Sequence, residues 1–202
     1  MKDQNLFRTV SYVTVVSSML LTGSGCALGD STAAIPTVEH FELERYLGKW
    51  YEIARLPHCF EKGLDNVTAD YSLRRDGKVA VHNSGLKDGK RRCVKGIAIR
   101  GGRPDQGFLK VSFFRPFYGE YRIIMMDPDY SWAVVTGETN DYLWILSRSS
   151  TIRKETLSAI LKKLRYLKFD VSRLEYPWHD PALSETEIPE CGTNTDSNQN
   201  TQ

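Results

Sequence analysis

The chain has 202 residues, with 27 Lys and Arg against 25 Asp and Glu, and a formal net charge of +2. This balance gives no bulk electrostatic reason to expect a nucleic-acid partner, and the length has room for one ordinary domain with extra segments. The four cysteines form no Cys-x-x-Cys pair, which disfavours a zinc site, so neither a metal nor a cofactor is predicted.

The N-terminal segment has the order of an export signal. Lys2 and Arg8 stand in a short polar start, a mostly apolar run follows over 10–21, and small residues lead up to Cys26. This order is typical of a cleaved signal peptide, and the apolar run is shorter than the roughly 20 residues that a membrane span needs. We therefore predict a signal peptide over 1–25.

Cys26 stands directly after Ser24 and Gly25. The arrangement resembles a bacterial lipobox, in which the cysteine becomes the first residue and carries the lipid. Gly23 departs from the leucine that this pattern prefers. The resemblance implies a lipid attachment at Cys26, with acyl chains such as palmitate, and Ala27 implies sorting to the outer membrane. The alternative is an ordinary cleaved signal with an incidental cysteine.

The residues that follow Cys26 are small and polar and include Pro36. Such composition is typical of a flexible tether. We predict that 26–40 form the lipidated N-terminus and tether. Because several acyl chains hold a protein at a membrane more stably than one chain does, the attachment would be lasting.

From Leu43 to Ser147, short segments of β-type residues alternate with turn signals. The predicted strands are 50–54, 68–73, 79–83, 93–99, 108–114, 121–126, 132–136 and 142–147. Two of the connections, 75–78 and 87–90, carry Asp-Gly, which is a strong hairpin signal. No helical segment intervenes, so the strands are antiparallel and must close or stack to hide their edges. A closed barrel of eight strands holds one small ligand.

One helical pattern follows the strands. Leucine and isoleucine recur at helical spacing from Leu157 to Leu164, with cations on the other side near the C-terminal end. We expect this helix to pack on the outside of the sheet. Residues 169–176 indicate one short added strand, and the polar sequence over 181–202 predicts a disordered tail.

Three stretches resemble the motifs of the lipocalin family, in the family's order. The opening Gly-x-Trp motif corresponds to 48–55, the middle motif to 127–133 with altered spacing, and the closing motif to 143–148. The similarity is strongest to the bacterial outer-membrane lipocalins, which are akin to apolipoprotein D. It implies an all-β fold: an eight-stranded antiparallel up-and-down β-barrel over 41–180, with one C-terminal α-helix packed outside and a short ninth strand.

The same resemblance gives Gly48, Trp50 and Arg148 a structural role. It implies that these residues lie at the closed end of the barrel, with the Arg148 guanidinium on the face of the Trp50 indole. Such a cation–π contact contributes about 0.5–2 kcal/mol. These residues are therefore not counted as ligand contacts.

Strand alternation predicts which side chains face the inside of the barrel. The more apolar side of each strand, checked against the family register, gives the cavity lining: Ala69, Tyr71, Leu73, Val79, Val81, Val94, Ala98, Leu109, Val111, Phe113, Tyr121, Ile123, Met125, Val134, Tyr142 and Trp144. Between 121 and 126 both sides are apolar, so the register there is open. For each residue, plain barrel core is the alternative to ligand contact.

The predicted interior is apolar, with three tyrosine hydroxyls as its polar contacts. An acyl chain would fit this interior, with a polar head at the mouth near Phe60, Arg115, Phe117 and Tyr118. The resemblance implies a fatty acid or a lysophospholipid as the ligand. It implies binding, storage or transport of this lipid for membrane maintenance, on the periplasmic face of the bacterial outer membrane. No catalytic activity is predicted.

Three other functions stay open. A lipocalin-like enzyme acting on a hydrophobic substrate would use Cys93, which alternation turns outward. A haem- or metal-binding lipocalin would need an inward histidine, and His82 is also predicted to point outward. The third is a filled barrel that serves as an interaction scaffold.

With Cys26 lipidated, three cysteines remain in a compartment that permits disulfides. A Cys59–Cys191 bridge and a Cys93–Cys191 bridge are both open. Either bridge leaves one thiol over, as a free cysteine or as the link of a homodimer.

Overall fold

The computed structural model describes residues 35–184. The predicted signal peptide, Cys26 and 185–202 of the predicted disordered tail lie outside the described residues.

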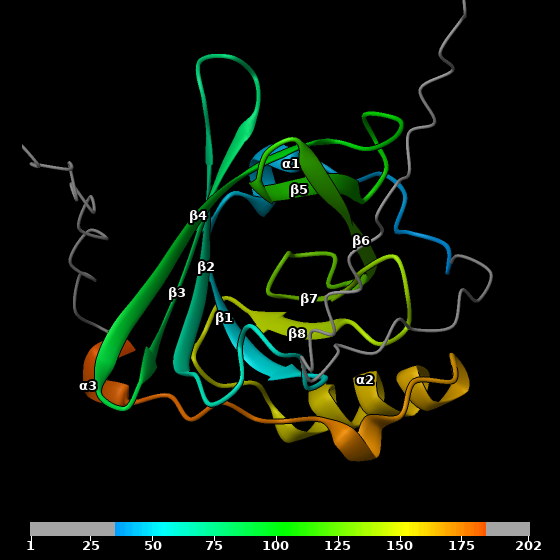
Figure 1. Cartoon of the computed structure of the whole chain (residues 1–202). Coiled ribbons are helices and arrows are strands. Elements are labelled where there is room, and N and C mark those ends of the chain that lie inside the picture. The colour runs from blue at the N-terminus through cyan, green and yellow to red at the C-terminus, as the bar shows by residue number, and fades with distance from the viewer. Residues whose placement is uncertain (1–34, 185–202) are drawn as a thin grey trace, which may run out of the picture.

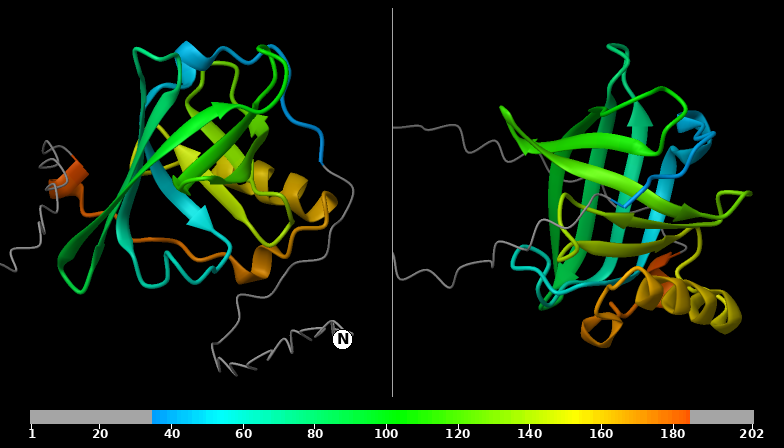
Figure 2. Two further views of the ribbon diagram at one scale, coloured as in Figure 1. Left: turned by 45° about the horizontal axis from the view of Figure 1, so that its top comes forward. Right: turned by 90° about the vertical axis from the view of Figure 1, so that its right-hand side faces the viewer.

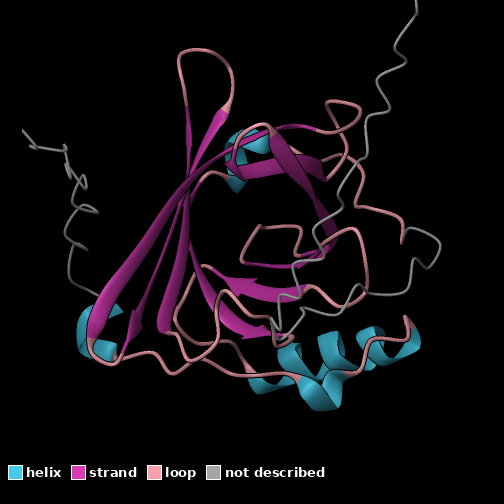
Figure 3. Ribbon diagram, in the orientation of Figure 1, coloured by secondary structure: helices cyan, strands magenta, loops and turns pink. Residues whose placement is uncertain are grey.

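Eight antiparallel strands close into one barrel, in which each strand pairs with the next and the last pairs with the first (Figures 1 and 3). The strands are β1 (Gly48–Arg55), β2 (Asp65–Leu73), β3 (Val79–Lys87), β4 (Lys90–Arg100), β5 (Phe108–Phe114), β6 (Phe117–Met126), β7 (Trp132–Thr136) and β8 (Leu143–Ser147). The predicted barrel and all eight predicted strands are confirmed.

The Asp-Gly turns form the two predicted hairpins. Asp88 and Gly89 both have positive φ, 52° and 70°, which is the backbone of a tight hairpin turn. The break predicted over 115–119 is shorter than expected. Only Arg115 and Pro116, joined by a cis peptide bond, separate β5 from β6.

The start of the described chain lies against the barrel. The Val38 N–H donates to the Ile123 carbonyl at 2.9 Å, and the Gly107 N–H donates to the Val38 carbonyl at 2.8 Å. Arg122 Nη2 also donates to the Ile35 carbonyl at 3.0 Å. The prediction of a flexible tether is therefore wrong from Ile35 onward, because these bonds hold the segment. The short helix α1 (Leu43–Tyr46) follows and buries Leu43 and Tyr46.

The predicted outer helix is α2 (Lys154–Tyr166), which lies against the outside of β7 and β8 (Figure 1). Its buried residues Ile160 and Leu164 pack with Val134 and Ile145 of the barrel wall. Packing on the outside of the sheet is confirmed. Among residues 35–184, no helix has the length and apolar character required to cross a membrane.

The predicted ninth strand is wrong except for one bridge. Residues Val171–Arg173 form a 3-10 helix (η1), because the Asp170 carboxylate accepts a hydrogen bond from the Ser172 N–H at 3.1 Å. Only Glu175 pairs with a strand, by an antiparallel bridge to Arg55. Within the predicted disordered tail, Pro181–Ser184 form a short helix, α3.

After this bridge the chain continues along the outside of β1 and β2. The Trp178 N–H donates to Asp65 Oδ1 at 2.9 Å, and the Asp180 N–H donates to Asn66 Oδ1 at 2.7 Å. His179 Nε2 lies 2.7 Å from the carbonyl oxygen of Glu52. This segment therefore holds β1 and the start of β2 from outside the barrel.

Candidate functional site

One end of the barrel is closed by Arg148 and Trp50. The guanidinium carbon of Arg148 lies 3.9 Å from the centroid of the indole ring. Its nitrogens donate to the carbonyl oxygens of Arg45, Lys49 and Tyr130, at 2.7, 2.9 and 3.3 Å. The predicted stacking is confirmed, and these bonds tie three chain segments together at this end.

Gly48 serves the same closure. Its φ is +90°, and a Cβ at this position would lie 3.4 Å from Arg148 Nη1. A residue with a side chain would be strained in this backbone conformation and would crowd the guanidinium. The structural role predicted for Gly48 is therefore supported by its geometry.

The inner face of the barrel carries a continuous apolar cluster that includes Trp50. The predicted lining residues in this cluster are Ala69, Tyr71, Val79, Val81, Ala98, Leu109, Val111, Tyr121, Ile123 and Trp144. Their inward orientation is as predicted, while their contact with a ligand stays a prediction. Ala133, Val135 and Leu146 belong to the same cluster and were not predicted.

Met125 and Val134 were predicted to face inward, and this is wrong. Both lie in the outer cluster that packs with helix α2. The pairing of β6 with β7 shifts register between Ile123 and Met125, so the strand changes which side chains face inward. On β7 both sides are apolar because α2 covers the outer one, and alternation therefore does not reveal the register.

The remaining predicted lining residues lie at the ends of the barrel. Leu73 stands at the closed-end tip of β2 and is 53% exposed, so it does not line the interior. Val94 and Phe113 alternate with inward-facing residues but are 39% and 37% exposed. The Phe113 ring covers Gly96, where a Cβ would lie 2.7 Å from ring carbon Cδ1. Tyr142 lies just before β8 and stacks on Trp144 with ring centroids 6.2 Å apart.

Val94, Phe113 and Tyr142 lie near the end of the barrel opposite the Arg148–Trp50 closure. We call this end the mouth, and it is formed by the β1–β2 loop (56–64), the β3–β4 hairpin, the β5–β6 hairpin and the β7–β8 loop (137–142). The four residues expected near a ligand head all belong to these loops and hairpins: Phe60, Arg115, Phe117 and Tyr118.

Three tyrosines form the polar floor of the interior. The hydroxyl of Tyr121 lies 2.6 Å from that of Tyr46 and 2.9 Å from that of Tyr71. Burial raises the pKa of all three hydroxyls above their ordinary value, so they stay neutral. Because the hydroxyls satisfy one another, the floor presents mainly ring surface to the space above it.

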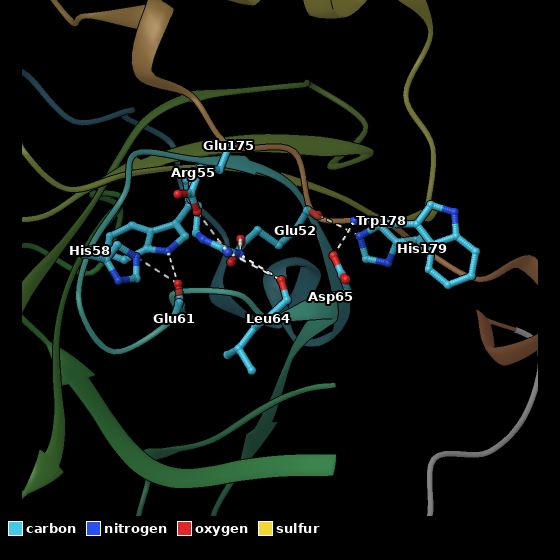
Figure 4. Close-up of polar contacts among 10 residues, drawn as sticks. Glu52, Arg55, His58, Glu61, Leu64, Asp65, Glu175, Trp178 and His179 are labelled. Carbon is cyan, nitrogen blue, oxygen red and sulfur yellow. Dashed lines mark hydrogen bonds and ion pairs between the residues drawn. The ribbon is translucent and has the colours of Figure 1, made fainter. Parts of the chain in front are cut away.

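A charged cluster links β1 to the β1–β2 loop of the mouth, and Figure 4 shows its contacts. Glu52 Oε1 lies 2.7 Å from Arg55 Nη1, and their side chains are 4% and 3% exposed. Arg55 also contacts the Glu175 carboxylate at 3.2 Å and the Leu64 carbonyl at 3.4 Å. Its guanidinium thus joins β1, the β1–β2 loop and the C-terminal segment.

The β1–β2 loop adds a second buried pair. His58 Nε2 lies 2.9 Å from Glu61 Oε2, an ion pair when the imidazole is protonated, and the side chains are 4% and 12% exposed. The same Glu61 carboxylate accepts a hydrogen bond from the Trp144 indole N–H at 3.0 Å. Through its hydrogen bond with Trp144, Glu61 therefore connects the β1–β2 loop to β8.

Burial and neighbouring charges act differently on the two carboxyl groups. Burial and the nearby Glu61 raise the pKa of Glu52 to about 8, against the opposite pull of Arg55. Burial also pushes the pKa of Glu61 upward, but its bonds from His58 and Trp144 outweigh this, and the pKa is lowered. For Arg55, burial opposes the charge, yet the surrounding carboxylates raise its pKa. The cluster thus keeps Glu61 ionised while Glu52 binds a proton more readily than usual.

The sequence-based prediction missed this cluster. Alternation from Trp50 places Glu52 on the same face, so β1 held a signal for it. Arg55 follows a register shift between Glu52 and Ala54, and His58 and Glu61 stand in a loop without periodicity. For these three residues the pattern gave no usable signal.

The cysteines differ from the prediction. Cys59 and Cys93 are both disulfide-bonded, so the alternative in which one of them stays a free cysteine is wrong. Cys93 is exposed on the outer side of β4, as predicted, and its sulfur is not a thiol nucleophile. His82 is also exposed, as predicted. Within residues 35–184, no group of three or more His, Cys, Asp or Glu side chains is placed to hold a metal.

Comparisons with known proteins agree with this architecture. The lipocalin-like domain family matches residues 41–179. Outer membrane lipoprotein Blc of Vibrio cholerae serotype O1 is 42% identical over 165 residues, which cover 80% of this chain and 94% of the relative. Outer membrane lipoprotein Blc of Escherichia coli K12 is 45% identical over 150 residues, covering 73% and 85%.

A solved structure supports the fold. Insecticyanin from the tobacco hornworm Manduca sexta superimposes with a TM-score of 0.61 at 22% sequence identity, covering 75% of this chain and 88% of that one. At this identity the likeness concerns the fold alone.

Proposed function

The chain belongs to the lipocalin family, and we propose that its barrel binds a lipid-like ligand, a fatty acid or a lysophospholipid, with the acyl chain inside and the polar head toward the mouth. The ligand is stored or transported for membrane maintenance at the bacterial envelope. Binding, and not catalysis, is the proposed activity.

One observation carries this proposal. The inner face of the barrel is largely apolar from the tyrosine floor up to Val111 and Trp144, and the charged cluster lies on the mouth side. Such a gradient matches a molecule with a long apolar chain and a polar end, because apolar surface is stabilised by leaving water and a polar head is not. We expect the polar head to stop near this cluster, which includes the Arg55 and Glu61 side chains.

The envelope location is proposed from the relatives and the N-terminal sequence. Relatives at 42% and 45% identity are named outer membrane lipoproteins. The present chain carries Cys26 after a stretch that resembles an export signal. We infer that Cys26 bears the lipid that holds the protein on the periplasmic face of the outer membrane. The barrel would then work within reach of the bilayer that supplies its ligand.

Displacement of a fluorescent fatty acid tests the binding. We expect the full-length protein to bind the probe at micromolar concentration or below, in one-to-one ratio, and palmitate or a lysophospholipid to displace it. Absence of saturable probe binding by folded protein would contradict the proposal. Binding with unchanged fluorescence after both competitors are added would contradict the assigned ligand class.

A further inference from the structure

The β5–β6 hairpin exposes aromatic side chains at its tip. Phe114 and Phe117 pair directly across the two strands and are 79% and 78% exposed. Tyr118 follows at 40% exposure. In the right-hand view of Figure 2 this hairpin reaches out beyond the neighbouring strands. Nothing in the packing of the barrel requires two phenylalanines in water at this place.

A further exposed ring stands on the same end of the barrel. Phe60 of the β1–β2 loop is 63% exposed, and its ring stacks on Tyr142 of the β7–β8 loop with centroids 6.2 Å apart. Both loops belong to the mouth as defined above. The mouth is therefore rimmed by large aromatic side chains on two sides.

The rim is also basic on the side of the β3–β4 and β5–β6 hairpins. On the mouth-side parts of these two hairpins the exposed acidic residue is Asp88, and the exposed cations are Lys87, Lys90, Arg92, Lys95 and Arg115. None of these cations forms a salt bridge with a residue in 35–184. Their charge is thus available to an anionic surface.

We propose that the mouth docks onto an anionic phospholipid bilayer, with Phe114 and Phe117 entering the headgroup layer and the cations of the β3–β4 hairpin facing the phosphates. This docking goes beyond ligand binding and does not depend on the lipid at Cys26. It turns the mouth of the barrel toward the bilayer. A lipid could then pass between bilayer and barrel without crossing open water.

The chemistry of the rim favours a bilayer over a protein partner. Aromatic rings are stable at the depth of lipid headgroups, and neighbouring Lys and Arg side chains are attracted to anionic lipids. Lysine is depleted from protein–protein interfaces, whereas this rim carries several. A narrow projecting hairpin enters a fluid headgroup layer more readily than it matches a flat protein surface.

Site-specific quenching tests the docking. In the full-length chain with Cys26→Ser, a tryptophan introduced by Phe117→Trp is compared with one introduced by Tyr166→Trp. Tyr166 is 75% exposed on α2, outside the mouth. The vesicles contain phosphatidylethanolamine, phosphatidylglycerol and a lipid brominated near the headgroup. We expect the added fluorescence at 117, but not at 166, to fall at least twofold. Equal quenching at the two positions, or none at 117, would overturn the proposal.

Two further variants separate the alternatives. Lys90→Glu with Lys95→Glu should reduce the fraction of the fluorescence that is quenched at 117 at least threefold. An unchanged fraction would contradict the proposed attraction between these cations and the lipid phosphates. Phe114→Ser with Phe117→Ser should leave the sedimentation mass unchanged. Conversion of a dimer into a monomer by this pair, with no quenching at 117, would assign the rim to contact between copies and overturn membrane docking.

The two measurements distinguish a failure of the docking proposal from a failure of the proposed ligand binding. Without vesicles, the single variant Phe114→Ser, which lies outside the residues expected near the ligand head, should bind the fluorescent fatty acid as the parent does. Probe binding without quenching at 117 would overturn docking alone. Quenching at 117 without probe binding in either protein would overturn the ligand proposal and leave the docking intact.

Discussion

Arg55 Nη1 lies 2.7 Å from Glu52 Oε1, and both side chains are almost completely buried on β1. The pair adds charge to a barrel whose inner face is otherwise largely apolar. Since Arg55 also reaches Leu64 and Glu175, it connects the β1–β2 loop and the C-terminal segment to the barrel wall. The Arg55 guanidinium therefore holds together the chain segments on the side of the mouth next to β1.

Removal of Arg55 alone should destabilise the fold. At pH 9, above the Glu52 pKa of about 8, Arg55→Met leaves an ionised Glu52 buried without its partner, and breaking a buried pair in this way costs about 3–5 kcal/mol. The double variant Glu52→Gln/Arg55→Met removes both charges and should recover at least half of the loss. Urea unfolding gives both free energies. A single variant as stable as the parent, or a double variant less stable than the single one, would contradict this role of the pair.

The raised pKa of Glu52 predicts a pH dependence. Its pKa is about 8 in the folded protein against an ordinary value of 4.5. Between these values the folded state holds a proton that the unfolded state has lost, so the free energy of unfolding should fall as pH rises from about 5 to 8. Glu52→Gln should reduce this slope. Urea titrations at three pH values measure it, and identical slopes in parent and variant would rule out Glu52 as the source.

Arg148 should be needed for stability and not for ligand affinity. Arg148→Ala loses the contact with Trp50 and three bonds to carbonyl oxygens, which predicts a loss of about 2–4 kcal/mol. Arg148→Lys should recover part of it, because lysine keeps the charge but not the planar donor geometry. The exposed Arg153, at the start of α2, supplies the control Arg153→Ala. Equal unfolding free energies for the two alanine variants would contradict the closure.

The two faces of β5 offer a matched test of the interior. Val111 faces inward and Lys110 is exposed on the outside of the same strand. Val111→Trp should weaken binding of the fluorescent fatty acid at least tenfold by filling the space, while Lys110→Trp should leave it unchanged. Circular dichroism checks that both variants fold. A folded Val111→Trp protein with parental affinity would place the ligand elsewhere.

Replacement of Cys26 should release the protein from the membrane pellet. Cys26→Ser removes the sulfur that would carry the acyl chains, each methylene of which contributes about 0.8 kcal/mol to membrane binding. In fractionated bacteria we expect the variant in the high-salt wash and the parent in the detergent extract. The salt is needed to remove the proposed docking contacts. A variant that still requires detergent would contradict lipidation at Cys26 as the anchor.

Much of the barrel could be predicted because each strand ends in a clear turn signal. Asp88 and Gly89 mark one hairpin, and the Trp50 and Arg148 motifs fix the closed end. Alternation then orients the strands whose outer face meets water. It fails at Met125 and Val134, because α2 makes the outer face apolar too and a register shift interrupts β6.

The charged cluster and the ninth strand lie beyond such patterns. His58 and Glu61 meet because the β1–β2 loop folds into the mouth, which no periodicity in the loop reveals. The strand expected over 169–176 has suitable residues, but Asp170 caps a 3-10 turn and Leu174 is buried. Local capping and burial determine the backbone conformation of this segment, and neither can be predicted from strand propensity.

Native mass spectrometry of the full-length protein, extracted from a bacterial envelope, tests lipid binding most directly. We predict a mass increment of one fatty acid or one lysophospholipid per chain, released on collisional activation and lost in the Val111→Trp variant. A parent protein that is folded and carries no lipid, and that acquires none when incubated with either lipid class, would contradict the central claim.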